Sequence, residues 1–267
     1  MRFASLGSGS KGNSTLVVAD DTILMIDCGF SLRETRKRLA RLAVEPKQID
    51  AILVTHEHSD HCTGVAALSR EYAIPVFLSH GTVGSGRCDG SYALQAFNSE
   101  ESFTIGGIRV QSVPVPHDAA EPCQFVLRWQ NQQLGILTDL GYVTPHVIDS
   151  FTDCDSLLLE FNHDVSMLDS GPYPEALKRR VGGHWGHLNN HQAAQLLNAL
   201  GGTPAGHLVI AHISENNNTK ALAEQALSEV PGALDKVVWA EQQLGFDWLN
   251  VVQPESPRLQ TEINADS

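Results

Sequence analysis

Three histidines and one aspartate lie close together in the run Thr-His-Glu-His-Ser-Asp-His, at His56, His58, Asp60 and His61. They directly follow the apolar segment 49–55, which predicts a buried strand whose end carries a functional loop. Imidazole and carboxylate groups bind zinc and other first-row metals. His56 and His58 point the same way in an extended segment, while Asp60 and His61 can face a second ion where the chain turns. We therefore interpret the run as a metal site rather than a histidine-rich surface loop.

This run resembles the HxHxDH signature of the metallo-β-lactamase superfamily, and four further residues match that family's pattern in order along the chain. Asp27 ends an early strand, His117 stands alone after a proline, Asp139 ends a later strand, and His212 follows a late one. The resemblance implies an α/β fold, the four-layer αββα metallo-β-lactamase sandwich. It also implies a dinuclear site at one edge of the sheets.

The resemblance assigns the metal ligands. It implies His56, His58 and His117 for one ion, Asp60, His61 and His212 for the other, and Asp139 as the bridge. Asp27 is expected to fix the HxHxDH loop rather than to bind metal. The cofactors are two divalent ions, with zinc expected first and manganese or iron as alternatives, because these donors accept all three.

Smaller motifs are similar to those of the YycJ/WalJ-like branch of the superfamily. Residues 6–14 resemble its SGSxGN(S/C) opening, 160–164 its acidic E-x-N-H-D stretch, and 212–218 its HLSxxNN element. Residues 186–190 resemble its GHLSN element, with Asn189 where serine is usual. Members of this branch look like 5′-to-3′ exonucleases or related phosphodiester hydrolases.

Two divalent ions about 4 Å apart can activate a water and clamp the oxygens of a phosphodiester. Asp60, His163 and His187 are the candidate catalytic residues, with His187 as a phosphate contact or a general acid. The Gly/Ser-rich opening can donate backbone N–H groups to a phosphate, although it could also be a plain turn. The candidate substrate-binding residues are Ser8, Ser10, Lys11, Asn13, Ser214 and Asn217.

The most direct prediction is a metal-dependent phosphodiesterase or 5′-to-3′ exonuclease that acts on DNA or RNA ends. The alternatives are a hydrolase of a small cyclic phosphate ester, a thioester or a lactone, and a non-catalytic metal protein. The complete ligand set argues against the last of these. Asp139 and His212 are too close in sequence to enclose the large inserted clamping domain of the β-CASP nucleases, and no long protruding RNA-gripping arm is visible.

Composition limits the partners. Acidic residues number 31 and basic residues 18, which argues against binding nucleic acid or anionic membranes through general charge. Bound metals can reverse the sign locally. The five cysteines form no CxxC pair, no signal peptide is evident, and no apolar run approaches the roughly 18 residues of a membrane span. We expect a cytoplasmic protein with no membrane partner; the oligomeric state stays open.

The elements that must position these residues alternate between strands and helices, which is typical of an α/β layered fold. Strands are predicted at 2–6, 14–19, 22–27, 49–55, 75–79, 103–105, 108–113, 124–129, 133–138, 156–161, 207–213 and 236–240. Helices are predicted at 65–72, 174–181, 192–200 and 220–230, besides one that Ser31 caps with Glu34 three residues later. We expect one catalytic domain, 1–252, and a polar C-terminal tail, 253–267.

Overall fold

The computed structural model describes residues 1–235 and 237–252, and these contain two mixed sheets. The first sheet contains β1 (Arg2–Gly7), β2 (Ser14–Ala19), β3 (Thr22–Ile26), β4 (Ala51–Leu53), β5 (Pro75–Ser79), β6 (Ala93–Phe97) and β14 (Phe246–Asn250). Its order is β14-β1-β2-β3-β4-β5-β6. The second contains β7 (Ser102–Ile105), β8 (Ile108–Pro114), β9 (Cys123–Trp129), β10 (Gln132–Leu137), β11 (Ser156–Glu160), β12 (Leu208–Ala211) and β13 (Val237–Trp239). Its order is β13-β12-β11-β10-β9-β8-β7.

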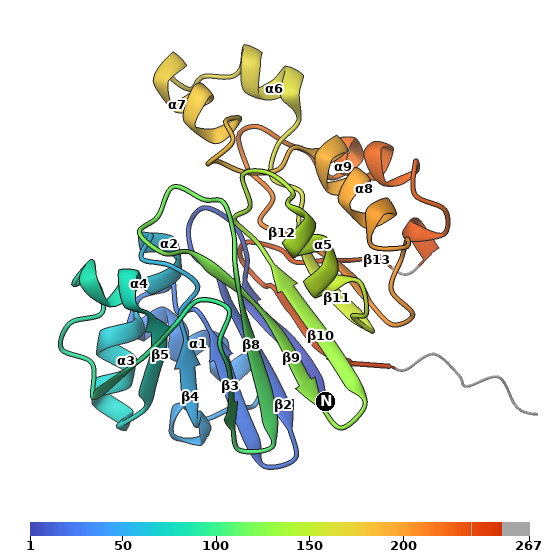
Figure 1. Ribbon diagram of the computed structural model, residues 1–267. Helices are drawn as coiled ribbons and strands as arrows, with labels where there is room; N and C mark the ends of the chain where they lie inside the picture. Colours follow the sequence, from blue (N-terminus) through green and yellow to red (C-terminus); the bar gives the residue numbers. More distant parts are fainter. Residues whose placement is uncertain (236, 253–267) are drawn as a thin grey trace, which may run out of the picture.

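Helices cover the outer faces of the two sheets (Figure 1). The first half of the chain contributes α1 (Leu32–Arg41), α2 (Ser59–Cys62), α3 (Val65–Tyr72) and α4 (His80–Gly84). The second half contributes α5 (Pro145–Phe151), α6 (Val165–Ser170), α7 (Glu175–Val181), α8 (Asn190–Ala199) and α9 (Lys220–Leu227). Two short 3₁₀ turns, Pro46–Gln48 and Ala233–Asp235, complete the described part. α6 and α7 project beyond one end of the sheets, as Figure 1 shows.

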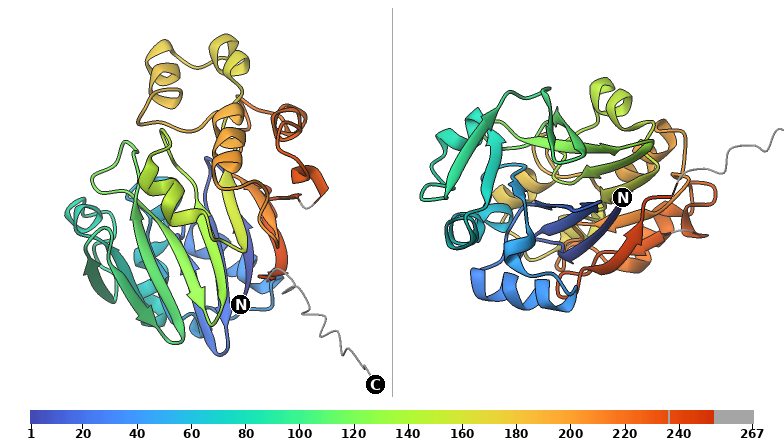
Figure 2. Two further views of the ribbon diagram at one scale, coloured as in Figure 1. Left: turned by 45° about the vertical axis from the view of Figure 1, so that its right-hand side comes forward. Right: turned by 90° about the horizontal axis from the view of Figure 1, so that it is seen from below.

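Three apolar layers hold the elements together, because neighbouring side chains of a strand point to opposite faces. In β1, Phe3 packs between the sheets while Ala4 packs under α1 and α3. In β11, Leu158 packs between the sheets while Leu157 packs under α5, α8 and α9. The resulting helix–sheet–sheet–helix layers, which Figure 2 shows from two further directions, confirm the predicted αββα sandwich.

Most of the predicted elements are present, with ends that shift by a few residues. Three pairs of consecutive predicted strands form antiparallel hairpins, β2 with β3, β7 with β8 and β9 with β10. Ser31 caps α1, since its side chain accepts a hydrogen bond from the backbone N–H of Glu34 at 3.4 Å. The sequence did not indicate β6, β14, α2, α4, α5 or α6. The predicted tail, 253–267, lies outside the described residues.

Strand ends from both sheets meet at one edge of the sandwich. β3 and β4 are parallel, as are β10, β11 and β12, so their carboxyl ends lie at the same edge. Asp27, Asp139 and His212 follow β3, β10 and β12, and each has a left-handed backbone, with φ of 60°, 54° and 51°. Non-glycine residues rarely adopt this conformation, and such strain concentrates at functional sites.

Candidate metal centre

Three imidazoles converge at the end of β4. His56 Nε2 lies 3.0 Å from His58 Nδ1, and His117 Nε2 lies 3.3 Å from the same His58 nitrogen. These three ring nitrogens lie within 4.8 Å of one another. His56 and His117 are buried, and His58 is partly buried. The arrangement presents three nitrogens to one point.

A second group lies beside the first. Asp60 Oδ2 is 3.5 Å from His61 Nε2 and 3.5 Å from His212 Nε2. Burial opposes ionisation of Asp60, but His61 and His212 hold the pKa of its carboxyl below the usual range. The carboxylate is therefore charged and faces two imidazoles.

Asp139 lies between the two groups and is almost completely buried. Its Oδ2 is 3.3 Å from His61 Nε2, while its Oδ1 is 3.4 Å from His212 Nδ1 and 4.0 Å from His117 Nε2. Although burial opposes ionisation, His212 and His61 hold the pKa of Asp139 well below its usual range. One charged carboxylate thus reaches both groups.

Outer hydrogen bonds determine which ring nitrogen faces inward. His117 Nδ1 lies 2.8 Å from the carbonyl oxygen of Gly186, and His58 Nε2 lies 3.2 Å from that of Asp118. Because a carbonyl oxygen only accepts, each of these nitrogens carries the proton. The opposite nitrogens, His117 Nε2 and His58 Nδ1, therefore point unprotonated lone pairs into the first group.

Asp27 does the same for the other two imidazoles of the motif. Its Oδ2 lies 2.8 Å from His61 Nδ1 and accepts from the Thr55 hydroxyl at 2.9 Å. Since that hydroxyl has one proton, it accepts from His56 Nδ1, which is 2.9 Å away. Asp27 thus directs the lone pairs of His61 Nε2 and His56 Nε2 into the two groups.

The donor set fits divalent cations. Four imidazoles and two carboxylates are directed at the same two points. Although burial opposes it, Asp139, Asp60 and Asp27 raise the pKa of His61 well above its usual range, so a bound cation would take the place of a proton there. Among the described residues, Asp139 Oδ2 and both ring nitrogens of His212 are buried without a hydrogen-bond partner. Unsatisfied buried polar atoms of this kind are costly, and a bound cation would satisfy them.

His187 stands beside these groups, held by a carboxylate that the sequence analysis did not single out. His187 Nδ1 is 3.1 Å from Glu160 Oε2 and 3.7 Å from Asp139 Oδ1. Glu160 is fully buried, and its Oε1 accepts from the backbone N–H of Leu140 at 2.5 Å and of Leu188 at 3.3 Å. In the sequence, Glu160 could have been noticed as a charged residue at the end of an apolar strand.

Comparison with known proteins identifies the family. The model of the β-lactamase superfamily domain matches residues 22–213. The chain is 35% identical over 237 residues to exodeoxyribonuclease YycJ of Bacillus anthracis, covering 86% of this chain and 89% of that protein. It is 31% identical over 270 residues to exodeoxyribonuclease WalJ of Streptococcus pneumoniae, covering 98% of each. The chain belongs to the metallo-β-lactamase superfamily, in its YycJ/WalJ branch.

Solved structures share the fold at low sequence identity. Zn²⁺-bound PqqB of Methylobacterium extorquens has a TM-score of 0.72 at 16% identity, covering 94% of this chain and 100% of its own. The family and the metal-ligand groups make this chain a metal-dependent hydrolase.

No helix of the described part is long and apolar enough to cross a membrane.

The Gly/Ser-rich opening of the enzyme packs against the ligand residues. The Ser8 hydroxyl accepts from the backbone N–H of His212 at 2.9 Å and donates to Asn13 Oδ1 at 3.2 Å. Asn13 Nδ2 donates to Asp60 Oδ2 at 3.4 Å. Ser8 and Asn13 are buried, whereas Ser10 and Lys11 are exposed. Lys11 forms an ion pair with the Glu215 carboxylate.

The other predicted residues of the enzyme lie at different distances from this centre. Ser214 and Asn217 are buried in the loop after His212, where the Ser214 hydroxyl accepts from the backbone N–H of Asn217 at 3.2 Å. His163 does not line the cavity described next, but a separate pocket bordered by α6 and α7. Burial lowers the pKa of His163 to about 4.

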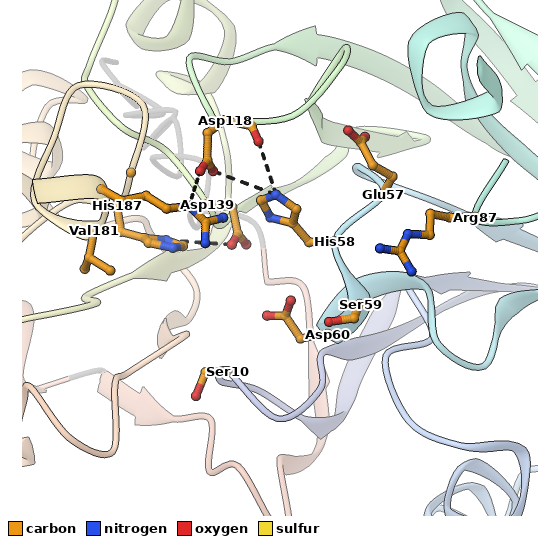
Figure 3. A pocket seen from close by; sticks show the side chains of 12 residues that line it. Ser10, Glu57, His58, Ser59, Asp60, Arg87, Asp118, Asp139, Val181 and His187 are labelled. Carbon is orange, nitrogen blue, oxygen red and sulfur yellow. Dashed lines mark hydrogen bonds and ion pairs between the residues drawn. The ribbon is translucent and has the colours of Figure 1, made fainter. Parts of the chain in front are cut away.

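A cavity of about 360 Å³ opens over the metal-ligand groups. Ser10, Asp139 and His187 line it, and two arginines, Arg87 and Arg180, lie on its wall. Figure 3 shows Arg87 and His187 on opposite sides. Neither arginine could be identified from the sequence, because the two are far apart along the chain and belong to no motif. Arg180 forms an ion pair with the Asp118 carboxylate, and Arg87 places a second guanidinium group on the wall beside the candidate metal centre.

Proposed function

We propose that the enzyme is a dinuclear exonuclease that removes nucleotides from the 5′ ends of DNA. The convergence of seven donor residues on two adjacent points, joined by Asp139, carries this proposal. His56, His58 and His117 would hold one ion, and Asp60, His61 and His212 the other. Zinc is the first choice of metal, with manganese or iron as alternatives. DNA is favoured because both named relatives are exodeoxyribonucleases.

Different residues of the chain have different roles in the proposed hydrolysis. The two ions, when bound, supply an activated water and neutralise phosphate charge. His187, held by Glu160 at 3.1 Å, faces the cavity and protonates the leaving oxygen as a general acid. Arg87 and Arg180 pair with phosphate oxygens, for which the guanidinium group is well suited.

The remaining predicted residues have supporting roles in this proposal. Ser10 lines the cavity and contacts substrate directly. Ser8 and Asn13 act through their hydrogen bonds to His212 and Asp60, because both are buried. Lys11, Ser214 and Asn217 are proposed to bind substrate at the edge of this loop cluster. His163 stays a predicted catalytic residue. Because it lines the neighbouring pocket rather than the cavity, it would act on catalysis without touching the scissile phosphate.

We further propose that residues 1–252 form one catalytic domain and that the enzyme works in the cytoplasm. β14 supports the first point, since it pairs with β1 and so joins the end of the described chain to its beginning. The five cysteines support the second, because all are free and buried, as is usual in a reducing compartment.

The test is digestion of a 5′-phosphorylated, 3′-labelled single-stranded oligodeoxynucleotide with Mn²⁺ or Zn²⁺ supplied. We expect progressive shortening from the 5′ end. His58→Ala and Asp139→Ala should remove most of this activity while circular dichroism shows a retained fold. Asp149→Ala is the matched control, since Asp149 is an exposed carboxylate on α5. Wild-type rates in both ligand variants would contradict the dinuclear mechanism.

The same purified enzyme can be used to distinguish the exonuclease from the alternative function, hydrolysis of a small molecule. A small cyclic phosphate ester, a thioester and a lactone should be assayed beside DNA with the same metal. Rapid turnover of one of these, with DNA left intact, would replace the exonuclease by a small-molecule hydrolase on the same centre.

A further inference from the structure

Two exposed aromatic side chains lie together on the surface of the enzyme. Trp185 is 59% exposed and Tyr142 is 38% exposed, and their ring centroids are 6.3 Å apart. His184 lies next to the same tyrosine, with ring centroids 5.7 Å apart. Leaving a tryptophan this open to water forgoes much of the free energy that its burial would contribute. The pair is therefore a candidate binding surface.

The backbone of this pair is tied to the candidate metal centre. Trp185 comes two residues before His187, and Tyr142 comes three residues after Asp139. The carbonyl oxygen of Trp185 accepts from the backbone N–H of Asp118 at 2.9 Å, and Asp118 lines the cavity. The aromatic pair thus lies on the same chain segments as residues that surround the scissile phosphate in the proposed function.

The two segments touch backbone to backbone, which fixes the spacing of the backbones that carry the rings. A Cβ placed on Gly141 would lie 2.1 Å from the carbonyl oxygen of His184 and 2.8 Å from Cα of Trp185. No side chain fits between the segments, so only glycine allows this approach. The surface is consequently rigid at its base and exposed at its rings, a combination that suits stacking of a flat ligand.

We propose that Trp185, with Tyr142 beside it, is a stacking platform for a nucleobase of the DNA strand. The base belongs to a nucleotide next to the phosphate held in the cavity, so this inference rests on the proposed exonuclease function. Arg180, whose side chain is 56% exposed on the cavity wall, pairs with the Asp118 carboxylate, and its exposed guanidinium N–H groups reach the phosphate that accompanies the base. The platform explains how a chain with an excess of acidic residues holds a polyanion.

The platform also defines the substrate class. A base inside a duplex already stacks on its neighbours and must be unstacked before it can reach the tryptophan. The preferred substrate is therefore a single-stranded or frayed DNA end. Stacking tolerates any base, because every base has a π-face, so little sequence preference is expected.

The experiment compares Trp185→Ala with the wild-type holoenzyme on two 5′-phosphorylated oligodeoxynucleotides. One has normal bases, and the other has abasic sugars at its four 5′-terminal positions. On the normal strand, we expect kcat/KM to fall roughly 5- to 150-fold, mainly through KM. On the abasic strand, the two enzymes should cleave at equal rates, since there is no base to stack. Trp185→Phe should retain most of the activity.

Leu234→Ala is the matched control, because Leu234 is 45% exposed but lies on a 3₁₀ turn that does not line the cavity. It should leave both rates unchanged. Metal content and melting temperature of every variant establish that the centre and fold are intact. If wild-type enzyme cleaves DNA and Trp185→Ala cleaves the normal strand equally well, the platform is wrong while the exonuclease function stands. An equal loss on both strands would make Trp185 structural. A wild-type enzyme that leaves DNA intact would overturn both proposals.

Discussion

Replacing Asp27 by asparagine changes one oxygen to an amide nitrogen at the residue that orients two imidazoles. In the wild-type enzyme, Oδ1 accepts from the backbone N–H of Thr55 at 2.8 Å, and asparagine can keep this bond. The other atom faces His61 Nδ1 at 2.8 Å and the Thr55 hydroxyl at 2.9 Å, both of which donate to it. An NH₂ group there meets two donors, so at least one partner must reverse its role.

The consequence reaches both groups of ligands. If His61 Nδ1 becomes an acceptor, its proton moves to Nε2, which then no longer offers a lone pair near Asp60 and Asp139. If the Thr55 hydroxyl turns instead, it donates to His56 Nδ1, and the proton of that ring moves to Nε2 in the same way. Loss of such an outer partner typically weakens metal binding 10- to 100-fold. That corresponds to about 1.4–2.7 kcal/mol, whichever of the two imidazoles changes its tautomer.

The assay is calorimetric titration of metal-free protein with Zn²⁺, supported by metal analysis after dialysis. Asp50→Asn is the matched control: Asp50 Oδ2 also accepts a backbone hydrogen bond, from Ile23 at 2.8 Å, but at the start of β4 and away from the centre. It should bind zinc like the wild type. Unchanged zinc affinity in a folded Asp27→Asn enzyme would refute the argument that Asp27 sets the tautomers.

Two further outcomes follow from the same structure. His187→Ala should lower kcat on DNA by a factor of about 10²–10⁴ with metal content unchanged, as expected for loss of a general acid; loss of metal would instead make His187 a ligand. Phe125→Ala should lower the free energy of unfolding in urea by about 3–5 kcal/mol, because Phe125 is fully buried between the sheets. A decrease below about 1 kcal/mol would show that the inter-sheet core closes around the lost ring.

Elements with a strong local pattern could be predicted from the sequence. α3 and β5 have the predicted bounds, since each is a continuous helix or strand pattern with a clear end. β6 and β14 could not be predicted in this way. Ala-Leu-Gln-Ala-Phe and Phe-Asp-Trp-Leu-Asn have no clear alternation, and each lies at an edge of the first sheet beside one partner strand. Pairing with β5 and β1, rather than local propensity, makes them strands.

Some residues of the candidate site could likewise be predicted from sequence motifs, and others could not. The sequence motif drew attention to the seven predicted ligands, and the structure brings all of them together. Asp118 and the two cavity arginines have common residue types and no diagnostic spacing, so only their positions in space mark them. Glu160 opens the acidic stretch 160–164, but its role as the partner of His187 is visible only in the structure. Ser8 and Asn13 belong to a conspicuous motif, yet the structure buries them against ligand residues.

The order of residues establishes which chemical groups are available: imidazoles and carboxylates at strand ends, and an alternation that builds layered sheets. These depend on neighbouring residues and on the fixed geometry of the backbone. Which nitrogen of each imidazole faces inward depends on the folded chain, because it is set by bonds such as those from His61 to Asp27 and from His117 to Gly186. Such partners are distant along the chain and meet only when the two sheets stack, so no local pattern encodes them.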